Sequence, residues 1–360
     1  MTDLKILILI SSINNSGGTE RVGSMLANSL YESGYEVILA SIGRSDKPFF
    51  VINKNIKLVS LLSFPRYKLL RIPTTIYNIR KLLKEDSIDT LIVVETLCIQ
   101  FTLPATLGLP VKHICWEHFN FNNDLGKASR RIARQLAARY CDSVVTLTER
   151  DKGYWLQGTQ HKSQITAIAN PCPFPIQDYI KKENTKIVLA VGRLTHIKGF
   201  DMLLEAWIQV NKAMPEWTLK IVGEGEDRVQ LNEFIEKYDL KDSVELVGLT
   251  DNVSEYYKQA EIFCLSSRFE GFPMVLLETL AFGLPVVSFD CDTGPAEILE
   301  GTGSILVAKN DIPQLSASLM RLMKNEEQRK NISIRSKEKA EFYQPENIIN
   351  KWVDLIEFSK

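Results

Sequence analysis

Short apolar runs alternate with segments of helical periodicity along the whole 360-residue chain. The predicted strands lie near 5–10, 36–41, 90–94, 111–115 and 143–147, and then near 186–191, 218–222, 244–247, 262–265, 285–289 and 304–307. Helical patterns lie between them, for example at 19–33, 127–140, 200–213, 227–237, 273–282 and 311–323. Strands that alternate with helices are typical of parallel sheets with helices on both faces. The sequence therefore predicts an α/β protein with two doubly wound, Rossmann-like domains.

A proline-rich segment separates the two series. Asn170-Pro171-Cys172-Pro173-Phe174-Pro175 cannot continue a helix or a central strand, because proline lacks the backbone N–H. We expect an interdomain linker at 170–184, an N-terminal domain over 1–172 and a C-terminal domain over 173–345. Apolar residues recur at helical spacing in 346–358, so the end of the chain, 346–360, is expected to contain a helix.

Composition excludes several classes of protein. Hydrophobic residues make up 45% of the chain and charged residues 24%, which is typical of a folded globular protein and not of a disordered one. No apolar run approaches the ~20 residues that span a membrane, and the apolar run at 5–10 is interpreted as a buried strand. The six cysteines form no Cys-x-x-Cys pair and are expected to be buried and reduced. Reduced cysteines and the interpretation of 5–10 as a strand predict a cytoplasmic location.

The net charge of −1 conceals an asymmetry. Residues 1–170 hold 21 basic and 14 acidic side chains, whereas the rest of the chain holds 22 basic and 30 acidic ones. Basic residues cluster at Arg66–Arg71 and Arg80–Lys84, and Lys127, Arg130, Arg131 and Arg134 share one face of a predicted helix. Phe119, Phe121 and Leu125 come just before that helix. Such a basic face is either solvated or able to dock on an anionic lipid surface. Nucleic-acid binding is not expected, because stacking aromatic residues are not interleaved with these charges.

Two motifs of the first half follow predicted strands. Gly17 and Gly18, followed by Arg21, lie between the first strand and a helix, where glycine permits close approach of a ligand and the helix presents free N–H groups. Trp116-Glu117-His118 comes at the end of a strand, the edge at which open α/β sheets bind ligands. A tight turn and a hydrogen-bonded surface histidine are the alternatives.

Two glycine loops follow strands in the second half. Gly192-Arg193-Leu194-Thr195-His196-Ile197-Lys198-Gly199 places two cations five residues apart, which suits a diphosphate. The loop Val222-Gly223-Glu224-Gly225-Glu226 has Arg228 where a dinucleotide fingerprint requires a third glycine. Both loops are therefore candidates for nucleotide contacts outside the dinucleotide-binding class, with solvated loop charges and a plain turn as alternatives.

The most specific feature is the pair Glu270 and Glu278. Pro273 suits the start of a helix, on which Glu278 would lie among apolar residues and so require a partner. Carboxylates can each accept hydrogen bonds from a pair of sugar hydroxyls. Asp290-Cys291-Asp292 matches a metal-binding D-x-D pattern, but the loop that enters a helix at Gly294-Pro295 favours phosphate binding. We expect no metal and no cofactor.

Taken together, these motifs resemble the retaining glycosyltransferases of family 4, which have the GT-B fold. The resemblance covers nearly the whole chain and includes the loop at Gly17-Gly18, Glu117-His118, Asn170-Pro171, Gly192-Arg193 with Lys198, Gly223–Glu226, Glu270 with Glu278, and Gly294-Pro295 with Glu297. It is similar in particular to bacterial enzymes that extend polyprenyl-diphosphate-linked glycans. The resemblance implies two domains that face each other across a cleft.

The resemblance also implies roles for the matching positions. Arg193 and Lys198 would neutralise the donor diphosphate, Glu278 would bind the ribose, and Glu270 and His118 would contact the donor sugar. The segment Gly271-Phe272-Pro273 and the loop at Gly294 would surround the sugar and the phosphates, with Gly17 and Gly18 beneath the diphosphate. The remaining candidate substrate-binding residues are Arg21, Glu117, Asn170 and Gly192. The final helix would pack on the N-terminal domain.

The predicted reaction is retaining transfer of a hexose or N-acetylhexosamine. A UDP-linked donor would bind the C-terminal domain, and a saccharide acceptor, expected to be linked to a polyprenyl diphosphate, would bind the N-terminal domain at an anionic membrane surface. No carboxylate pair has clear acid–base spacing, so front-face attack is expected, with the leaving phosphate taking the acceptor proton. The alternatives are a sugar-nucleotide epimerase and a non-catalytic two-lobed sugar-binding protein.

Overall fold

A computed structural model describes residues 4–43, 47–61, 71–124, 126–177 and 185–358. The chain divides into two compact units, and each is described by itself. Unit 1 comprises Met1–Pro171 and Pro345–Lys360, and unit 2 comprises Cys172–Gln344. The division falls at the first proline of the proline-rich segment.

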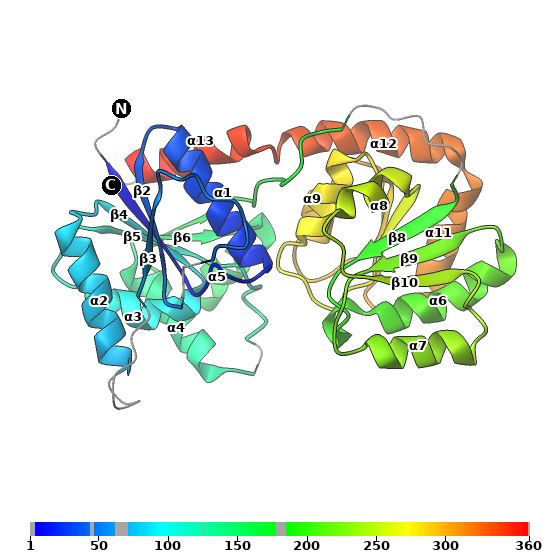
Figure 1. Cartoon of the computed structure of the whole chain (residues 1–360), viewed down its shortest axis with the longest axis horizontal. Helices are drawn as coiled ribbons and strands as arrows, with labels where there is room; N and C mark the ends of the chain where they lie inside the picture. The colour runs from blue at the N-terminus through cyan, green and yellow to red at the C-terminus, as the bar shows by residue number, and fades with distance from the viewer. Residues whose placement is uncertain (1–3, 44–46, 62–70, 125, 178–184, 359–360) are drawn as a thin grey trace. The chain divides into compact units, whose positions relative to one another are not determined.

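The described residues of unit 1 form a parallel sheet of seven strands (Figure 1). Its order is β3-β2-β1-β4-β5-β6-β7. The strands are β1 (Lys5–Ile10), β2 (Glu36–Ser41), β3 (Lys57–Ser60), β4 (Thr90–Val94), β5 (Lys112–Trp116), β6 (Ser143–Thr146) and β7 (Gln164–Ala167). The helices are α1 (Gly18–Glu32), α2 (Arg71–Glu85), η2 (Thr96–Cys98), α3 (Ile99–Thr106), α4 (Ala128–Tyr140) and α5 (Glu149–Gly158).

The described residues of unit 2 form a second parallel sheet, of six strands in the order β10-β9-β8-β11-β12-β13. The strands are β8 (Ile187–Val191), β9 (Thr218–Val222), β10 (Val244–Gly248), β11 (Ile262–Leu265), β12 (Val286–Phe289) and β13 (Ile305–Val307). The helices are η3 (His196–Lys198), α6 (Phe200–Ala213), α7 (Arg228–Lys237), α8 (Val253–Gln259), α9 (Met274–Ala281), α10 (Pro295–Leu299), α11 (Ile312–Lys324) and α12 (Glu326–Glu341).

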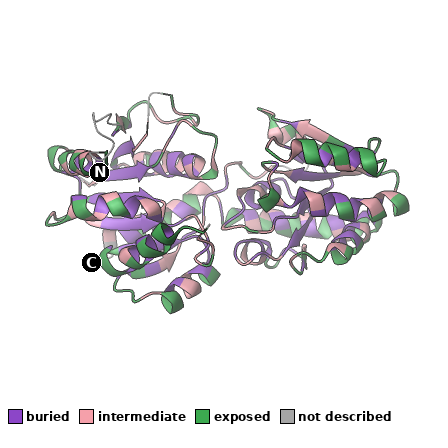
Figure 2. Cartoon of the chain, turned by 90° about the horizontal axis from the view of Figure 1, so that it is seen from below, coloured by how far each residue is buried: buried purple, intermediate pink, exposed green. Residues whose placement is uncertain are grey.

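Each unit has its own hydrophobic core, formed where helices cover a sheet. In unit 1, apolar side chains of β1, β4 and β5 pack against α2, α3 and α4 on one face. In unit 2, side chains of β8, β9 and β11 pack against α6, α7 and α11. The central strands are largely buried, and exposed residues lie on the outer sides of the helices (Figure 2). The prediction of two doubly wound α/β domains is confirmed.

The last helix, α13 (Pro345–Phe358), belongs to unit 1 and lies beside α1 (Figure 1). Trp352 is fully buried and makes an edge-to-face contact with Trp116, at 4.9 Å between ring centroids. Lys112 Nζ donates to the carbonyls of Leu355 and Ile356 in the last turn of α13. A cation is favourable at this end of a helix, because the last carbonyls have no partners within the helix.

All six cysteines are buried and free, as expected. No helix among the described residues is both long and apolar enough to cross a membrane.

Candidate functional site

The strand order reverses once in each sheet, and most of the predicted site residues follow strands at or near these positions. In unit 1 the chain runs outward from β1 to β2 and β3 and then returns to β4, so the reversal lies between β1 and β4. In unit 2 the equivalent position lies between β8 and β11. Open parallel sheets bind ligands beyond the carboxyl ends of the strands at such a switch point. Each unit therefore offers one candidate binding edge.

The loop after β1 contains Gly17, which is the N-cap residue of α1. A Cβ at Gly17 would come within 2.3 Å of a carboxylate oxygen of Glu20, so this position must lack a side chain for Glu20 to fold back over the helix start. Glu20 is buried and accepts a hydrogen bond from Thr19 Oγ1 at 2.8 Å. Gly18 is free of steric neighbours, and the guanidinium of Arg21 lies over the Phe50 ring at 5.8 Å.

His118 follows β5 by two residues. Its ring lies 4.5 Å from the Trp116 ring, and its Nε2 is buried without a hydrogen-bond partner among the described residues. Burial lowers the pKa of the His118 imidazole to about 3. The ring is therefore neutral at physiological pH and has an unused polar atom, and both properties suit hydrogen bonding to an uncharged sugar.

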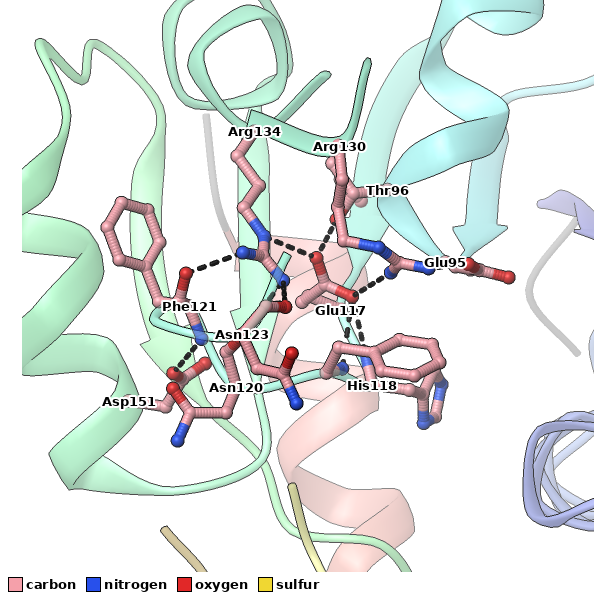
Figure 3. A network of polar contacts seen from close by, with 12 residues as sticks. Glu95, Thr96, Glu117, His118, Asn120, Phe121, Asn123, Arg130, Arg134 and Asp151 are labelled. Carbon is pink, nitrogen blue, oxygen red and sulfur yellow. Dashed lines mark hydrogen bonds and ion pairs between the residues drawn. The ribbon is translucent and has the colours of Figure 1, made fainter. Parts of the chain in front are cut away.

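Glu117, a predicted substrate-binding residue, lies in the interior of unit 1. The residue is 1% exposed, and its carboxylate accepts from Thr96 Oγ1, from Arg134 Nε at 3.1 Å, and from the backbone N–H groups of His118 and Phe119 at 3.0 and 3.1 Å (Figure 3). These bonds occupy both of its oxygens, so Glu117 orients the loop that carries His118.

Arg134 completes this network. Its guanidinium donates to the carbonyls of Asn120 and Asn123 at 3.0 and 3.1 Å and also to the carbonyl of Phe121. Asp151 Oδ1 accepts from the N–H of Phe121 at 2.7 Å (Figure 3). Buried polar groups, the Arg134 guanidinium and the Asp151 carboxyl, thus hold the loop that follows His118.

Arg130 forms a second ion pair, with Glu95, at 2.8 Å. Arg130 and Arg134 are each 2% exposed, so the prediction that both lie on an exposed basic face of α4 is wrong. The apolar Ile132, in contrast, is 60% exposed. The helix presents these arginines inward because Glu117, which is buried, and Glu95, which is partly buried, provide counterions. Of the flanking residues, Leu125 and Arg66–Leu70 lie outside the described part of the chain.

Asn170 is the last predicted residue of unit 1. It is 3% exposed, and its side-chain oxygen has no hydrogen-bond partner among the described residues. This burial places the amide inside the fold.

In unit 2 the two glycine loops contact each other through their backbones. The N–H of Gly192 donates to the carbonyl of Val222 at 3.0 Å. A Cβ on Gly223, whose φ is +144°, would lie 1.9 Å from the carbonyl oxygen of Gly192, and one on Gly225 would lie 2.2 Å from that of Leu194. Glycine is required at these positions for the loops after β8 and β9 to approach so closely.

Lys198 and Glu270 form an ion pair at the switch point of unit 2. Lys198 Nζ lies 2.7 Å from Glu270 Oε1, which also accepts from Ser267 Oγ at 2.6 Å. The Glu270 side chain is 9% exposed and that of Lys198 26%. Arg193 lies apart from this pair, since its side chain is 78% exposed and 4.0 Å from Glu226. The structure therefore brings together Lys198 and Glu270 and leaves Arg193 open to solvent.

Glu278 lies on α9 and is 4% exposed. The hydroxyl of Tyr257 donates to Glu278 Oε2 at 2.6 Å, and the Tyr257 ring stacks on Phe282 at 5.2 Å. The partner that a buried glutamate requires is thus a tyrosine from α8. Pro273 is the N-cap of α9, directly before its first turn.

Thr293 ties the segment after Glu270 to the loop at Gly294. Its hydroxyl lies 3.0 Å from the carbonyls of both Glu270 and Gly271. Gly294 has a φ of +97°, and a Cβ there would lie 2.5 Å from Pro273 Cδ. Phe272 is 8% exposed. Within the described ranges, His, Cys, Asp and Glu side chains nowhere gather in groups of three that could hold a metal ion, Asp290 and Asp292 included.

Several residues that shape these loops lack a sequence signature. Arg268 pairs with Asp201 through two hydrogen bonds of 2.7 and 2.6 Å and donates to the carbonyl of His196 at 2.8 Å. Ser266 Oγ donates to the carbonyl of Lys198 at 3.0 Å. The pair Ser266-Ser267, directly after β11, is a local polar signal that could have indicated these contacts.

Comparisons with known proteins agree with this geometry. The model described as "Glycosyltransferase Family 4" matches residues 16–173, and the model described as "Glycosyl transferases group 1" matches residues 175–339. An uncharacterized glycosyltransferase of Haemophilus influenzae is 38% identical over 98% of this chain and 99% of its own. The amylovoran biosynthesis glycosyltransferase AmsD of Erwinia amylovora is 34% identical, with the same coverage.

A Campylobacter jejuni enzyme that transfers N-acetylgalactosamine to an undecaprenol-linked glycan is 28% identical over 98% of both chains. Among solved structures, the lipopolysaccharide outer core galactosyltransferase WaaB superposes with a TM-score of 0.81 at 23% identity, covering 98% of this chain and 99% of its own. The pneumococcal O-GlcNAc transferase GtfA, solved with UDP and GlcNAc, gives 0.80 at 15% identity, with 100% and 99% covered. The chain therefore belongs to the family 4 glycosyltransferases and has the GT-B fold.

Proposed function

We propose that this glycosyltransferase moves a hexose or N-acetylhexosamine from a UDP-linked donor to a saccharide acceptor, with retention of anomeric configuration. The observation that carries the proposal is the Lys198–Glu270 ion pair at the switch point of unit 2. One partner supplies a cation for the donor diphosphate, and the other supplies a carboxylate for sugar hydroxyls. GtfA, which shares the fold, was solved with UDP and GlcNAc.

The chemistry follows from the charges. Cleavage of the bond between the anomeric carbon and the diphosphate leaves negative charge on the phosphate, and fixed cations stabilise that charge in the transition state. We assign this role to Lys198 and to the exposed Arg193. Glu278, fixed by Tyr257, is assigned to the ribose hydroxyls. Attack occurs on the face that the diphosphate leaves, and the leaving phosphate accepts the proton of the acceptor hydroxyl.

Unit 1 is assigned to the acceptor. Two motifs of this unit are assigned to the donor, as the family resemblance implies: His118, with its neutral imidazole, to the donor sugar, and Gly17 and Gly18 to the donor diphosphate. A polyprenyl-diphosphate-linked glycan is the proposed acceptor, within the synthesis of a bacterial surface polysaccharide or glycan. The names of the Campylobacter and Erwinia relatives support this assignment.

The donor assignment is tested by thermal unfolding in the presence of a panel of sugar nucleotides. A ligand that binds the native state raises its stability, so we expect one or a few UDP-sugars to raise the Tm. The same nucleotides should have little effect on Lys198→Ala. Product stereochemistry, measured by NMR, tests retention: an inverted anomeric configuration would exclude front-face attack. No shift with any nucleotide sugar would contradict the donor assignment.

Two further assignments belong to the proposal. We assign charge neutralisation to Arg193 and Lys198 and not to a metal, and we therefore expect full turnover in EDTA.

We also assign contact with an anionic membrane to α2, because Lys81 and Lys84 are exposed and Tyr77 is 65% exposed on this helix. The double variant Lys81→Glu/Lys84→Glu should lose binding to phosphatidylglycerol vesicles while keeping its UDP-sugar shift. Unchanged vesicle binding would show that these lysines form an ordinary solvated face and do not contact the membrane.

A further inference from the structure

Glu95 is the first residue after β4, so it lies at the carboxyl edge of the sheet on one side of the switch point of unit 1. The Gly17-Gly18 loop follows β1 on the other side. In unit 2 the residue that directly follows the equivalent strand, β11, is Ser266, which leads to Ser267 and Glu270. Glu95 in unit 1 therefore corresponds in position to Ser266 in unit 2, where the segment that carries Glu270 begins.

The backbone at Glu95 is strained. Its φ of 79° lies in the left-handed region that residues other than glycine rarely adopt. Two backbone hydrogen bonds hold it there, from its N–H to the carbonyl of Trp116 at 2.8 Å and from the N–H of Cys98 to its carbonyl at 3.1 Å. Such strain persists only where surrounding structure enforces it, and it is concentrated at functional sites.

The Glu95 carboxylate is half satisfied. Its Oε1 accepts from Arg130 at 2.8 Å, and within the described ranges its other oxygen has no hydrogen-bond partner (Figure 3). The side chain is 19% exposed, whereas the Arg130 side chain behind it is 3% exposed and lies over the Phe119 ring at 4.0 Å. Glu117, in contrast, uses both of its oxygens internally. Glu95 therefore presents a fixed, charged acceptor to solvent.

We propose that Glu95 binds the saccharide acceptor, with its free carboxylate oxygen accepting a hydrogen bond from an acceptor hydroxyl. Arg130 and Phe119 are positioning residues that hold the carboxylate in place. This inference rests on the proposed function, in which unit 1 binds the acceptor. Burial also raises the pKa of the Glu95 carboxyl, and Arg130 opposes this effect. The ion pair therefore favours the charged form of the Glu95 carboxylate.

The test uses the full chain with UDP-glucose, UDP-galactose, UDP-GlcNAc and UDP-GalNAc as donors. The acceptors are p-nitrophenyl glycosides of glucose, galactose, N-acetylglucosamine and N-acetylgalactosamine. With the pair that the wild type uses fastest, Glu95→Gln should raise the acceptor KM at least tenfold, because charged acceptors form the stronger hydrogen bonds. The donor KM and the UDP release without acceptor should stay within twofold. Glu36→Gln, at the opposite edge of the same sheet and paired with Lys5 on the surface, is the matched control and should change none of these values.

Glu95→Asp keeps the charge but shortens the side chain, so it should raise the acceptor KM as well and serves if Glu95→Gln folds poorly. An unchanged acceptor KM in a folded variant would overturn the assignment of Glu95. Equal changes in the donor and acceptor KM would overturn it too, since they indicate a purely structural role. Failure of the proposed function differs from both, because the wild type itself would then gain no thermal stability from any UDP-sugar and would transfer sugar to no acceptor.

Discussion

The candidate binding edges of the two units are held in place by different means. In unit 1, ion pairs fix the loops: a fully buried one between Glu117 and Arg134, and a partly buried one between Glu95 and Arg130. In unit 2, the loops after β8 and β9 pack backbone against backbone at Gly192 and Gly223. The side chains of Arg193 and Lys198 stay partly exposed. Two of the basic residues in the first half, Arg130 and Arg134, therefore serve as internal counterions. In the acidic half, the two cations proposed to bind the donor diphosphate remain partly or largely exposed to solvent.

The largest expected effect is in unit 1. Glu117→Ala removes one partner of a buried pair, which typically costs about 3–5 kcal/mol, because the remaining charge is left uncompensated. Urea unfolding, with hydrogen exchange to locate the loss in β5 and α4, measures this. Glu36→Ala removes a carboxylate from an exposed pair in the same unit and should cost less than about 1 kcal/mol. Similar losses for both variants would mean that burial of the pair is unimportant.

The next effect concerns catalysis in unit 2. Lys198→Ala should lower kcat by about a hundredfold or more, corresponding to ~3 kcal/mol of transition-state stabilisation. Lys220→Ala, which breaks a surface pair with Glu245, should leave turnover within twofold. Steady-state UDP release measures both. Normal turnover of Lys198→Ala would remove the distinction between the functional cations of unit 2 and the structural ones of unit 1.

The glycine contact of unit 2 can be tested separately. Gly223→Ala should destabilise the protein by roughly 3 kcal/mol, because the new Cβ would meet a backbone oxygen at a positive φ. Gly153→Ala, in α5 with no atom near its Cβ, should instead stabilise by about 0.5–1 kcal/mol. Thermal and urea unfolding distinguish these signs. A neutral Gly223→Ala would show that the two loops move apart easily.

The smallest predicted effect depends on pH. Burial raises the pKa of Asp151 from 3.8 to about 7, and Glu117 adds to this while the Phe121 N–H and Arg134 oppose it. The folded state therefore holds a proton that the unfolded state has lost, and its stability falls as pH rises from about 4 to 7. Asp151→Asn should escape this loss, so between pH 5 and 7 its stability should rise by about 2 kcal/mol relative to wild type.

Asp86→Asn, in a surface pair with Lys57, is the control for that measurement and should follow the wild-type pH dependence. Parallel profiles for Asp151→Asn and the wild type would show that the Asp151 carboxyl does not bind a proton on folding.

Much of the fold follows from local pattern. The buried central strands form continuous apolar runs, so their positions were predicted to within a residue or two. The edge strands β3 and β7 were missed because they are short and partly exposed, with little apolar pattern. α12 was missed for a related reason, since its apolar residues do not gather on one side.

The site was only partly predictable. Glycines and acidic pairs have fixed spacing in the sequence, so the loops around Gly192 and Glu270 were found. The orientation of α4 was not predicted. Helical spacing places Arg130 and Arg134 on one face of the helix, but it does not show what that face packs against. Their counterions Glu95 and Glu117 directly follow the neighbouring strands β4 and β5, and that proximity exists only in the folded sheet.

The place of α13 has a consequence for biosynthesis. Trp352 covers Trp116, and Lys112 holds the last turn of α13, yet the ribosome makes this helix only after all of unit 2. Domains fold as units while the chain emerges, and exposed apolar surface in a partly made domain favours aggregation. The side of the Trp116 ring that packs on α13 therefore stays uncovered in unit 1 until unit 2 has been translated. Termination of translation near residue 344 would therefore release a chain in which unit 2 is complete but unit 1 lacks α13.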